Sequence, residues 1–277
     1  MSMNIKQKLL GNSLGRLALS FRNKINILLT AYYDIENVST LANDQLATKL
    51  VTTICQSRMT FIDVGVHLGS IISEVAYHDP SIKIVGIEAV PDKVVNLQRK
   101  FPFVSFHNCA VGETTGEMPF FVNTKNSGYS SLGKATAVKE ESVISEIKVS
   151  VKKLDELITS DDVDVIKIDV EGAELGVLLG SLKILTNNRP IIMFESGPQQ
   201  NDGLGYTKEA LYQLLNLNKY AVLVPNRVAH NDPGLTLDGF IESHLYPRRT
   251  TNYFAIPKER RIQVRDKARK ILKTSVS

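Results

Sequence analysis

The chain has 277 residues, of which 43% are hydrophobic, and its formal net charge is +4. This length and composition are typical of one globular α/β domain with additions, no apolar run reaches membrane-spanning length, and we identify no signal peptide. Cys55 and Cys109 are too few for a disulfide framework and lack the spacing of a structural zinc site, so we expect a reducing, cytoplasmic setting.

The positive charge is confined to the two ends of the chain. Residues 1–33 carry a net charge of +5 and residues 258–277 carry +6, whereas residues 34–257 carry −7. We therefore expect a basic helical extension at 1–57, a main domain at 58–257 and a basic helical tail after it. The acidic main domain does not predict a nucleic-acid partner.

The N-terminal segment predicts an amphipathic helix. Its hydrophobic residues recur at helical spacing, with the basic residues mostly off the stripe. The stripe consists of Leu10, Leu14, Leu17, Phe21, Ile25 and Leu28. We expect it to pack on the main domain or on a second subunit of a homo-oligomer. The alternative is peripheral contact with an anionic membrane, at its inner surface.

Residues 60–69, TFIDVGVHLG, predict a buried strand that breaks into a turn and then a helix. Asp63 lies at the end of the strand, and Gly65 and Gly69 bracket the turn around His67. Ligands bind at such turns in open α/β sheets. The spacing is not the G-x-G-x-x-G of a dinucleotide site. A carboxylate here would repel a pyrophosphate but attract the cationic end of S-adenosylmethionine (SAM), so SAM is favoured over NAD.

A second predicted strand, residues 82–88, also ends in an acid. Glu88 lies 25 residues after Asp63, about the separation at which a strand-end acid meets a ribose. Its two oxygens could accept hydrogen bonds from both ribose hydroxyls. Residues 103–112 predict a third strand and a loop that passes the adenine in this topology. The candidates for that contact are His107, Asn108, Cys109 and Ala110.

Two later strands end in acids as well. Residues 162–185 predict a strand ending at Asp169, a turn through Glu171 and a helix, and a fifth strand ends at Glu195. The carboxyl ends of parallel strands meet at one edge of a sheet, so four acids converge there: Asp63, Glu88, Asp169 and Glu195. Asp169 and Glu171 could merely favour the helix N-terminus, by about 0.3–1 kcal/mol. Their expected position beside the first strand, however, is where a methyl donor would lie.

The remaining segments predict further elements. Strands are expected at 117–122, 147–151, 220–224 and 252–256, and helices at 40–57 and 207–217. The Gly/Ser-rich stretch 126–133 around Tyr129 is either an active-site loop or a surface turn. The loop 225–240, which contains His230, is long enough to cover a substrate.

From about Phe61 to Pro257 the chain resembles the FkbM-type SAM-dependent methyltransferases. The matching segments are FIDVGVHLG at 61–69, GIEAVPDK at 86–93, NCAVGE at 108–113, the serines at 130–131, VIKIDVEGAEL at 165–175 and IIMFESG at 191–197. The resemblance implies a class I methyltransferase (Rossmann-like) α/β fold, with helices on both faces of a mostly parallel seven-stranded sheet. It also implies SAM as methyl donor and an acceptor oxygen, commonly a hydroxyl of a sugar, polyketide or other glycan-like product. Val66 and His67 stand where the family often has Ala-Asn, and Ala89 where it often has Pro.

Methyl transfer requires an aligned acceptor oxygen and a group that removes its proton. We expect Asp169 or Glu171 to be the base or to orient the acceptor, with Glu195 assisting, and His67 and His230 are further candidates. The predicted cofactor-binding residues are Asp63, Gly65, His67, Gly69, Glu88, Ala89, Asn108, Cys109, Ala110 and Asp169. No ligand spacing demands a metal ion. The competing hypotheses are a non-catalytic module that binds SAM or a partner, and an NAD enzyme, which the glycine spacing disfavours.

Overall fold

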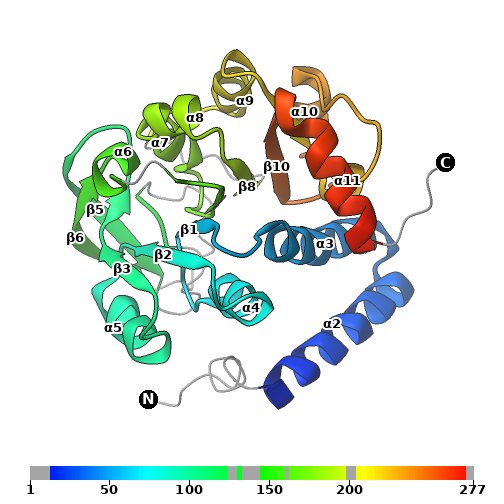
Figure 1. Ribbon diagram of the computed structural model, residues 1–277, viewed down its shortest axis with the longest axis horizontal. Coiled ribbons are helices and arrows are strands. Elements are labelled where there is room, and N and C mark those ends of the chain that lie inside the picture. Colours follow the sequence, from blue (N-terminus) through cyan, green and yellow to red (C-terminus); the bar gives the residue numbers. More distant parts are fainter. Residues whose placement is uncertain (1–12, 124–129, 133–143, 160–161, 198–203, 273–277) are drawn as a thin grey trace.

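The computed structural model describes residues 13–123, 130–132, 144–159, 162–197 and 204–272, with side chains from residue 21 onward. A seven-stranded sheet forms its centre (Figure 1), with the strand order β3-β2-β1-β7-β8-β10-β9. The strands are β1 (Thr60–Val64), β2 (Lys83–Glu88), β3 (Ser105–Asn108), β7 (Val165–Ile168), β8 (Ile191–Glu195), β9 (Tyr220–Leu223) and β10 (Asn252–Pro257). Only the pairings of β10, with β8 and with β9, are antiparallel within this sheet. The predicted mostly parallel sheet is therefore confirmed.

Helices cover both faces of the sheet, because successive residues of a strand point to opposite sides. In β1, Phe61 belongs to one hydrophobic core and Ile62 to the other. The first core includes residues of α3 (Val38–Ile54), α4 (Ser70–His78), α5 (Pro91–Lys100) and α11 (Arg261–Leu272). The second includes residues of α6 (Leu154–Leu157), α7 (Glu174–Leu179), α8 (Leu182–Asn187), α9 (Lys208–Leu217) and α10 (Leu237–Glu242).

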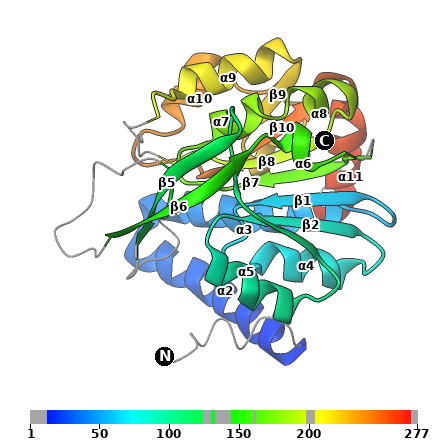
Figure 2. The same ribbon diagram turned by 90° about the vertical axis from the view of Figure 1, so that its left-hand side faces the viewer.

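A second, three-stranded sheet lies beside the main one. It has the order β4-β6-β5 and consists of β4 (Ala110–Val111), β5 (Gly116–Asn123) and β6 (Ile144–Lys152). The sequence predicted strands near 117–122 and 147–151 but not their pairing. Figure 2 shows the long antiparallel pair β5 and β6 in front of the main sheet.

The single helix expected after Glu171 is two helices, α7 and α8. Gly180 separates them, and a Cβ there would lie 2.2 Å from the carbonyl oxygen of Gly112. The carboxylate of Asp155 then accepts the N–H groups of Lys183 and Ile184, at 2.9 and 3.0 Å, in the first turn of α8. A side chain from α6, distant in the sequence, therefore supports a new helix start that the continuous leucine spacing does not reveal.

The N-terminal segment forms α2 (Ser13–Tyr33), followed by the short 3-10 helix η1 (Ile35–Asn37) and α3. Helix α3 is part of the domain core, where Leu50 and Ile54 are fully buried. Helix α2 runs along the outside of the molecule (Figure 1), and its apolar stripe is exposed from Phe21 onward. For Phe21, Ile25 and Leu28, the stripe residues whose side chains the structure describes, the expected packing on the main domain is therefore wrong. Among the described helices, none has both the length and the hydropathy needed to cross a membrane.

Candidate functional site

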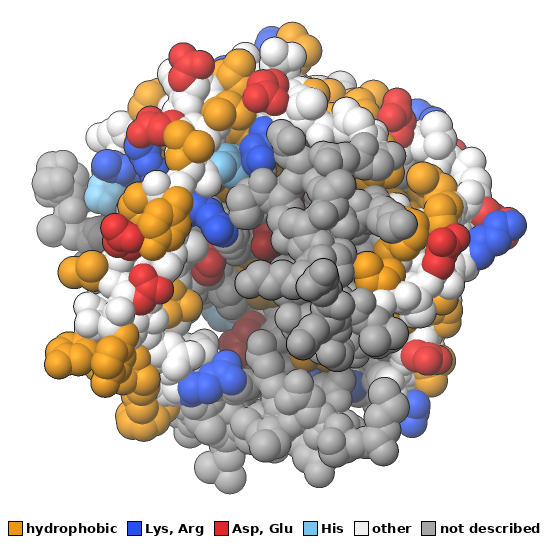
Figure 3. Space-filling model, turned by 180° about the vertical axis from the view of Figure 1, so that it is seen from behind, with side chains coloured by type: hydrophobic (Ala, Val, Ile, Leu, Met, Phe, Trp, Pro, Cys, Tyr) orange, Lys and Arg blue, Asp and Glu red, His pale blue; other side chains and the backbone are white. Residues whose placement is uncertain are grey.

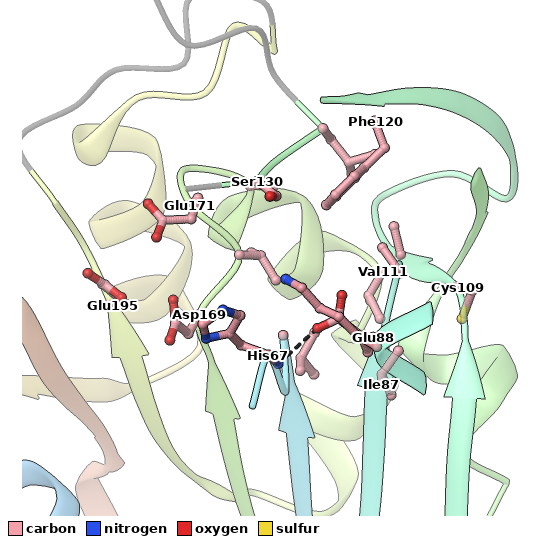
Figure 4. Close-up of a pocket in the computed structure, with 18 residues that line it drawn as sticks. His67, Ile87, Glu88, Cys109, Val111, Phe120, Ser130, Asp169, Glu171 and Glu195 are labelled. Atoms are coloured by element: carbon pink, nitrogen blue, oxygen red, sulfur yellow. Dashed lines mark hydrogen bonds between the residues drawn. The ribbon is translucent and has the colours of Figure 1, made fainter. Parts of the chain in front are cut away.

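A cavity of about 740 Å³, partly open to solvent, lies at the carboxyl ends of β1, β2, β7 and β8 (Figure 4). The predicted residues that line it are Gly65, His67, Glu88, Ala89, Cys109, Ala110, Asp169, Glu171 and Glu195. Asp63, Gly69 and Asn108 are not among its lining residues. The convergence of strand ends therefore brings most of the predicted site residues together.

The turn after β1 lies in close backbone contact with the ends of β2 and β7. Gly65 has φ +81°, and a Cβ on it would lie 1.8 Å from the backbone oxygen of Asp169. The N–H of Gly65 donates to the carbonyl oxygen of Ile87 at 2.9 Å. His67 also has a positive φ, +54°, which is uncommon for a residue with a side chain. Only glycine at position 65 allows this close approach, which opens space for a ligand above the turn.

Glu88 is held by backbone groups on both of its oxygens. Oε2 accepts the N–H of His67 at 2.8 Å, the dashed line in Figure 4, and Oε1 accepts the N–H of Val90 at 3.0 Å. Asn108 fixes the same segment, because its Nδ2 donates to the carbonyl oxygens of Glu88 and Ala89 at 3.0 Å. A carboxylate oxygen has room for a second donor, so Glu88 can still accept ribose hydroxyls. Asn108 acts as a support for this segment.

Asp63 lies behind the cavity and pairs with a lysine that the sequence reasoning did not single out. Lys167 Nζ lies 3.1 Å from Asp63 Oδ1 and 3.2 Å from Asp169 Oδ2, and it donates to the carbonyl oxygen of Gly65 at 2.8 Å. Burial raises the pKa of Asp63 to about 6. Burial opposes the charge of Lys167, but attraction to Asp169 and Asp63 raises its pKa overall. The sequence did contain a signal for this buried ion pair, because Lys167 interrupts the otherwise apolar strand VIKI at 165–168.

Three acids converge at the mouth of the cavity (Figure 4). One carboxylate oxygen each from Asp169, Glu171 and Glu195 lies within 4.8 Å of the others. Burial and the adjacent Asp169 raise the pKa of Glu195 to about 10, and the two carboxyl groups hydrogen-bond to each other. The pKa of Asp169 is lowered: burial opposes its charge, but Lys167 and the hydrogen bond from Glu195 outweigh burial. At neutral pH the pair therefore holds one proton, on Glu195.

Glu171 is the acid whose pKa lies nearest to neutrality among these three. Burial, followed by repulsion from Asp169, raises its pKa to about 8. Its backbone is also in the left-handed region, with φ +53°. Carboxylate oxygens are the ligands that divalent cations such as Mg²⁺ prefer. Among the residues that the structure describes, Asp169, Glu171 and Glu195 form a group that could hold such an ion.

A second cavity, of about 610 Å³ and open to solvent, adjoins the first. Glu171 and Glu195 line both cavities, so the acids lie at the junction. Glu174, also in the wall of the second cavity, accepts the N–H groups of Val170 at 3.3 Å and Gly172 at 3.0 Å. It thereby fixes the loop that carries Glu171. The sequence reasoning did not predict this role of Glu174, although its position three residues after Glu171 was a possible signal for it.

Further polar residues line the second cavity. They include Ser196, Tyr206, Thr207 and Lys208. Ser196 Oγ lies 2.8 Å from Nε2 of His244, whose other ring nitrogen lies 2.7 Å from the carbonyl oxygen of Phe240. This histidine, which sequence reasoning also missed, braces the wall from behind.

The two loops expected near the site have different positions. Ser130 and Leu132, from the Gly/Ser-rich stretch, line the first cavity beside Phe120, whereas Tyr129 lies outside the described residues. The loop 225–240 lines neither cavity. Arg261 of α11 fastens that loop by donating to the carbonyl oxygens of Val228, His230 and Asp232 at 2.8, 2.7 and 3.2 Å.

The acidic strand ends lie on the far side of the molecule from the viewpoint of Figure 1. Figure 3 shows that side, where acidic side chains are visible in a hollow between the described residues. The carboxylate of Asp169, whose pKa is lowered, lines the first cavity and favours a cationic ligand. The close-fitting glycine turn and the anchored Glu88 fit a ribose on that ligand.

This strand order, with antiparallel β10 beside β8 and the cavity above β1 and β2, defines a class I methyltransferase fold. The sequence matches the family model of the methyltransferase FkbM domain over residues 63–222, which is more than half of the chain. The protein belongs to this FkbM family of SAM-dependent methyltransferases, and SAM is the cofactor of the family. The fold and the family inferred from the sequence motifs are thus confirmed.

The chain is similar to several solved methyltransferase structures at low sequence identity. The FkbM methyltransferase from Methylobacillus flagellatus KT is 16% identical, with a TM-score of 0.45 over 73% of this chain and 44% of that one. This chain therefore spans less than half of that protein. A TehB-like SAM-dependent methyltransferase from Corynebacterium glutamicum is 10% identical, with a TM-score of 0.39 over 76% of this chain and 85% of that one. The plantazolicin methyltransferase BpumL, in complex with SAH, has the same identity and TM-score over 90% and 91%. Curated protein sequences give no match.

Proposed function

We propose that the protein transfers the methyl group of SAM to a hydroxyl oxygen of a sugar, a glycan or a similar natural product. The observation that carries this proposal is the position of Glu171 and Glu195, which line both cavities. A group that removes or orients the proton of an acceptor hydroxyl belongs at such a junction. The polar wall of the second cavity suits an acceptor with several hydroxyl groups.

The first cavity is the proposed SAM site. The Gly65 turn and Asp169 receive the methionine part, Glu88 accepts the ribose hydroxyls, and Cys109 and Ala110 flank the adenine. These residues line one continuous cavity. When bound, SAM supplies an electrophilic methyl group on a positively charged sulfur. The carboxylate of Asp169, kept ionised by Lys167 at 3.2 Å, favours that charge.

Glu171 is the proposed general base. The sequence left Asp169 and Glu171 as alternatives, and their surroundings distinguish them. Asp169 is bound to Lys167 and to the proton of Glu195, and its lowered pKa makes it a weak base. Glu171 has a pKa of about 8 and borders the acceptor cavity, so it can take a hydroxyl proton near neutral pH. Glu195, which is protonated, donates to Asp169 and so positions it.

The test combines cofactor binding with methyl transfer. Calorimetry of the full chain with S-adenosylhomocysteine (SAH) measures binding, and incubation with isotope-labelled SAM and a panel of sugars, oligosaccharides and polyketides measures transfer. We expect SAH binding, together with label on an oxygen of at least one acceptor. Glu171→Gln should keep SAH binding and lose transfer, whereas Glu209→Gln, on an exposed position of α9, should keep both.

Two results would contradict the proposal. SAH binding without transfer to any class of acceptor would favour the non-catalytic SAM-binding module. Label found on nitrogen or carbon would retain the methyltransferase activity but exclude transfer to oxygen.

A further inference from the structure

From Phe21 onward, where the structure describes its side chains, helix α2 contacts the rest of the protein along one side. The side chains of Asn23, Ile27 and Thr30 are partly buried, and the backbone oxygen of Asn23 accepts a hydrogen bond from Gln45 Nε2 of α3 at 2.9 Å. These positions are separated by four and three residues and so share one side of the helix. That side faces α3, which is itself buried in the domain core.

The opposite side of α2 is apolar and exposed. At about 100° per residue, Phe21, Ile25, Leu28 and Tyr32 project directly away from the side that faces α3. Phe21 is 67% exposed, Leu28 70% and Tyr32 81%. Leu29 and Tyr33 are also exposed and widen this stripe. We call these six residues the outer face of α2, and no described part of the chain covers it.

The charges around the outer face indicate what covers it. Arg22 and Lys24 are exposed: Lys24 lies on one flank of the outer face, and Arg22 lies near its other edge, on the same side as Leu29 and Tyr33. The whole of α2 contains no acidic residue. Asp34 and Glu36 lie after the end of the helix, where they accept hydrogen bonds from Asn37 and Tyr246 at 2.8 and 2.6 Å. Pairing with a second α2 would bring basic side chains together, and that helix offers no acidic residue of its own to pair with them. An anionic surface supplies opposite charges to both basic side chains at once.

We propose that α2 binds the surface of an anionic lipid bilayer. The outer face lies in the boundary between headgroups and acyl chains, and Arg22 and Lys24 extend to the headgroup phosphates. Tyrosines such as Tyr32 and Tyr33 suit this boundary, because each has an apolar ring and a polar tip. In Figure 3, hydrophobic side chains project at the lower left, at the edge of the molecule that α2 occupies. The contacts of α2 with α3 place the domain beside the bilayer.

The test is flotation of the full chain with two kinds of vesicle: phosphatidylcholine alone, and phosphatidylcholine mixed with phosphatidylglycerol. We expect binding to the mixed vesicles that falls as salt is added. Arg22→Gln with Lys24→Gln should weaken it by about fivefold for each basic residue removed. Phe21→Ser with Leu28→Ser should abolish it. Tyr77→Ser is the matched control, since Tyr77 of α4 is also 67% exposed but lies outside the outer face.

Several outcomes would overturn the lipid proposal. Equal binding to both kinds of vesicle, no binding, or full binding by the Phe21→Ser and Leu28→Ser variant would each do so. A dimer in sedimentation equilibrium that this variant dissociates would show that a second copy covers the outer face. SAH calorimetry on the same variants should be unchanged, so failure of this proposal is distinguishable from failure of the proposed catalytic function.

Discussion

The ammonium group of Lys167 lies 3.1 Å from a carboxylate oxygen of Asp63, and both side chains are almost entirely buried beneath the cavity. The same ammonium group lies 3.2 Å from Asp169 and donates to the carbonyl oxygen of Gly65. One buried cation therefore connects the ends of β1 and β7 with the turn between β1 and α4. Lys167 thereby holds these three groups together beneath the cavity.

Removal of this cation should destabilise the fold. We expect Lys167→Met to lower the free energy of unfolding by about 3–5 kcal/mol, because two carboxyl groups lose their positive partner. Asp63 already has a raised pKa, and stability linked to a raised acid pKa is lost as pH rises through the folded-state value. The loss should therefore be greater at about pH 8 than at about pH 5, where Asp63 can be protonated.

Urea unfolding at the two pH values measures this effect. Lys83→Met is the matched control, since Lys83 is exposed at the start of β2 and should change stability by less than about 0.5 kcal/mol. Equal stability of Lys167→Met and the natural protein would show that the buried pair contributes nothing.

The turn at Gly65 gives a second prediction. In Gly65→Ala the new methyl group would meet the backbone of Asp169, and alanine would also occupy a positive φ, which together cost roughly 1–3 kcal/mol or more. We expect SAH affinity to fall at least about tenfold, because the turn must move into the cavity. Gly116→Ala is the control, since no atom lies within 4 Å of its added Cβ. Calorimetry with SAH and thermal unfolding follow both variants, and unchanged SAH affinity in Gly65→Ala would separate this turn from cofactor binding.

The sequence predicted the main sheet because its parallel strands are continuous apolar runs, and an acid or a glycine turn marks the carboxyl end of several of them. Glu88 and Asp169 could be placed in one cavity because parallel strands align their ends at one edge. Asp63 follows the same pattern in sequence but is buried beneath the cavity and paired with Lys167. The reason is that β1 continues to Val64, so Asp63 lies within the strand, whereas Glu88 ends β2 and Asp169 follows β7. Sequence patterns do not place a strand end to within one residue, so this difference was not predictable.

Contacts between distant segments were the part that pattern reasoning could not supply. Gly180 lies between α7 and α8, where the backbone of Gly112 approaches too closely to leave room for a Cβ. The carboxylate of Asp155 accepts hydrogen bonds from the first turn of α8. The loop that contains His230 was expected near the substrate, but four hydrogen bonds from Arg261 attach it to α11. Periodicity reports which face of one element is apolar, and it carries no information about which partner meets that face.

The proposed base predicts a pH dependence of catalysis. A general base acts in its ionised form, and the pKa of Glu171 is raised to about 8. The turnover number should therefore rise as pH increases through about 8. Glu171→Gln should lower turnover by about 10²–10⁴-fold and remove that rise, with little change in SAH affinity. If the rise persists in a weakened Glu171→Gln enzyme, another group is the base.

His244 predicts a pH dependence of stability that is independent of catalysis. Burial is the main cause that lowers its pKa to about 4, because its environment disfavours the charged ring. For a base with a lowered pKa, the associated stability is present above the unfolded-state value of about 6.5 and is lost as pH falls towards the folded-state value. Charging of this one group should lower the free energy of unfolding by about 2 kcal/mol between about pH 7 and about pH 4.5.

The raised pKa values of Glu174 and Glu195 act in the opposite direction, so the natural protein alone does not isolate the effect. The informative quantity is the difference in unfolding free energy between the natural protein and His244→Gln, measured with urea at both pH values. That difference should shrink by about 2 kcal/mol at the lower pH, whereas His78→Gln, at an exposed position at the end of α4, should show no such change. A difference that stays constant with pH would mean that His244 is not buried as a neutral ring behind Ser196.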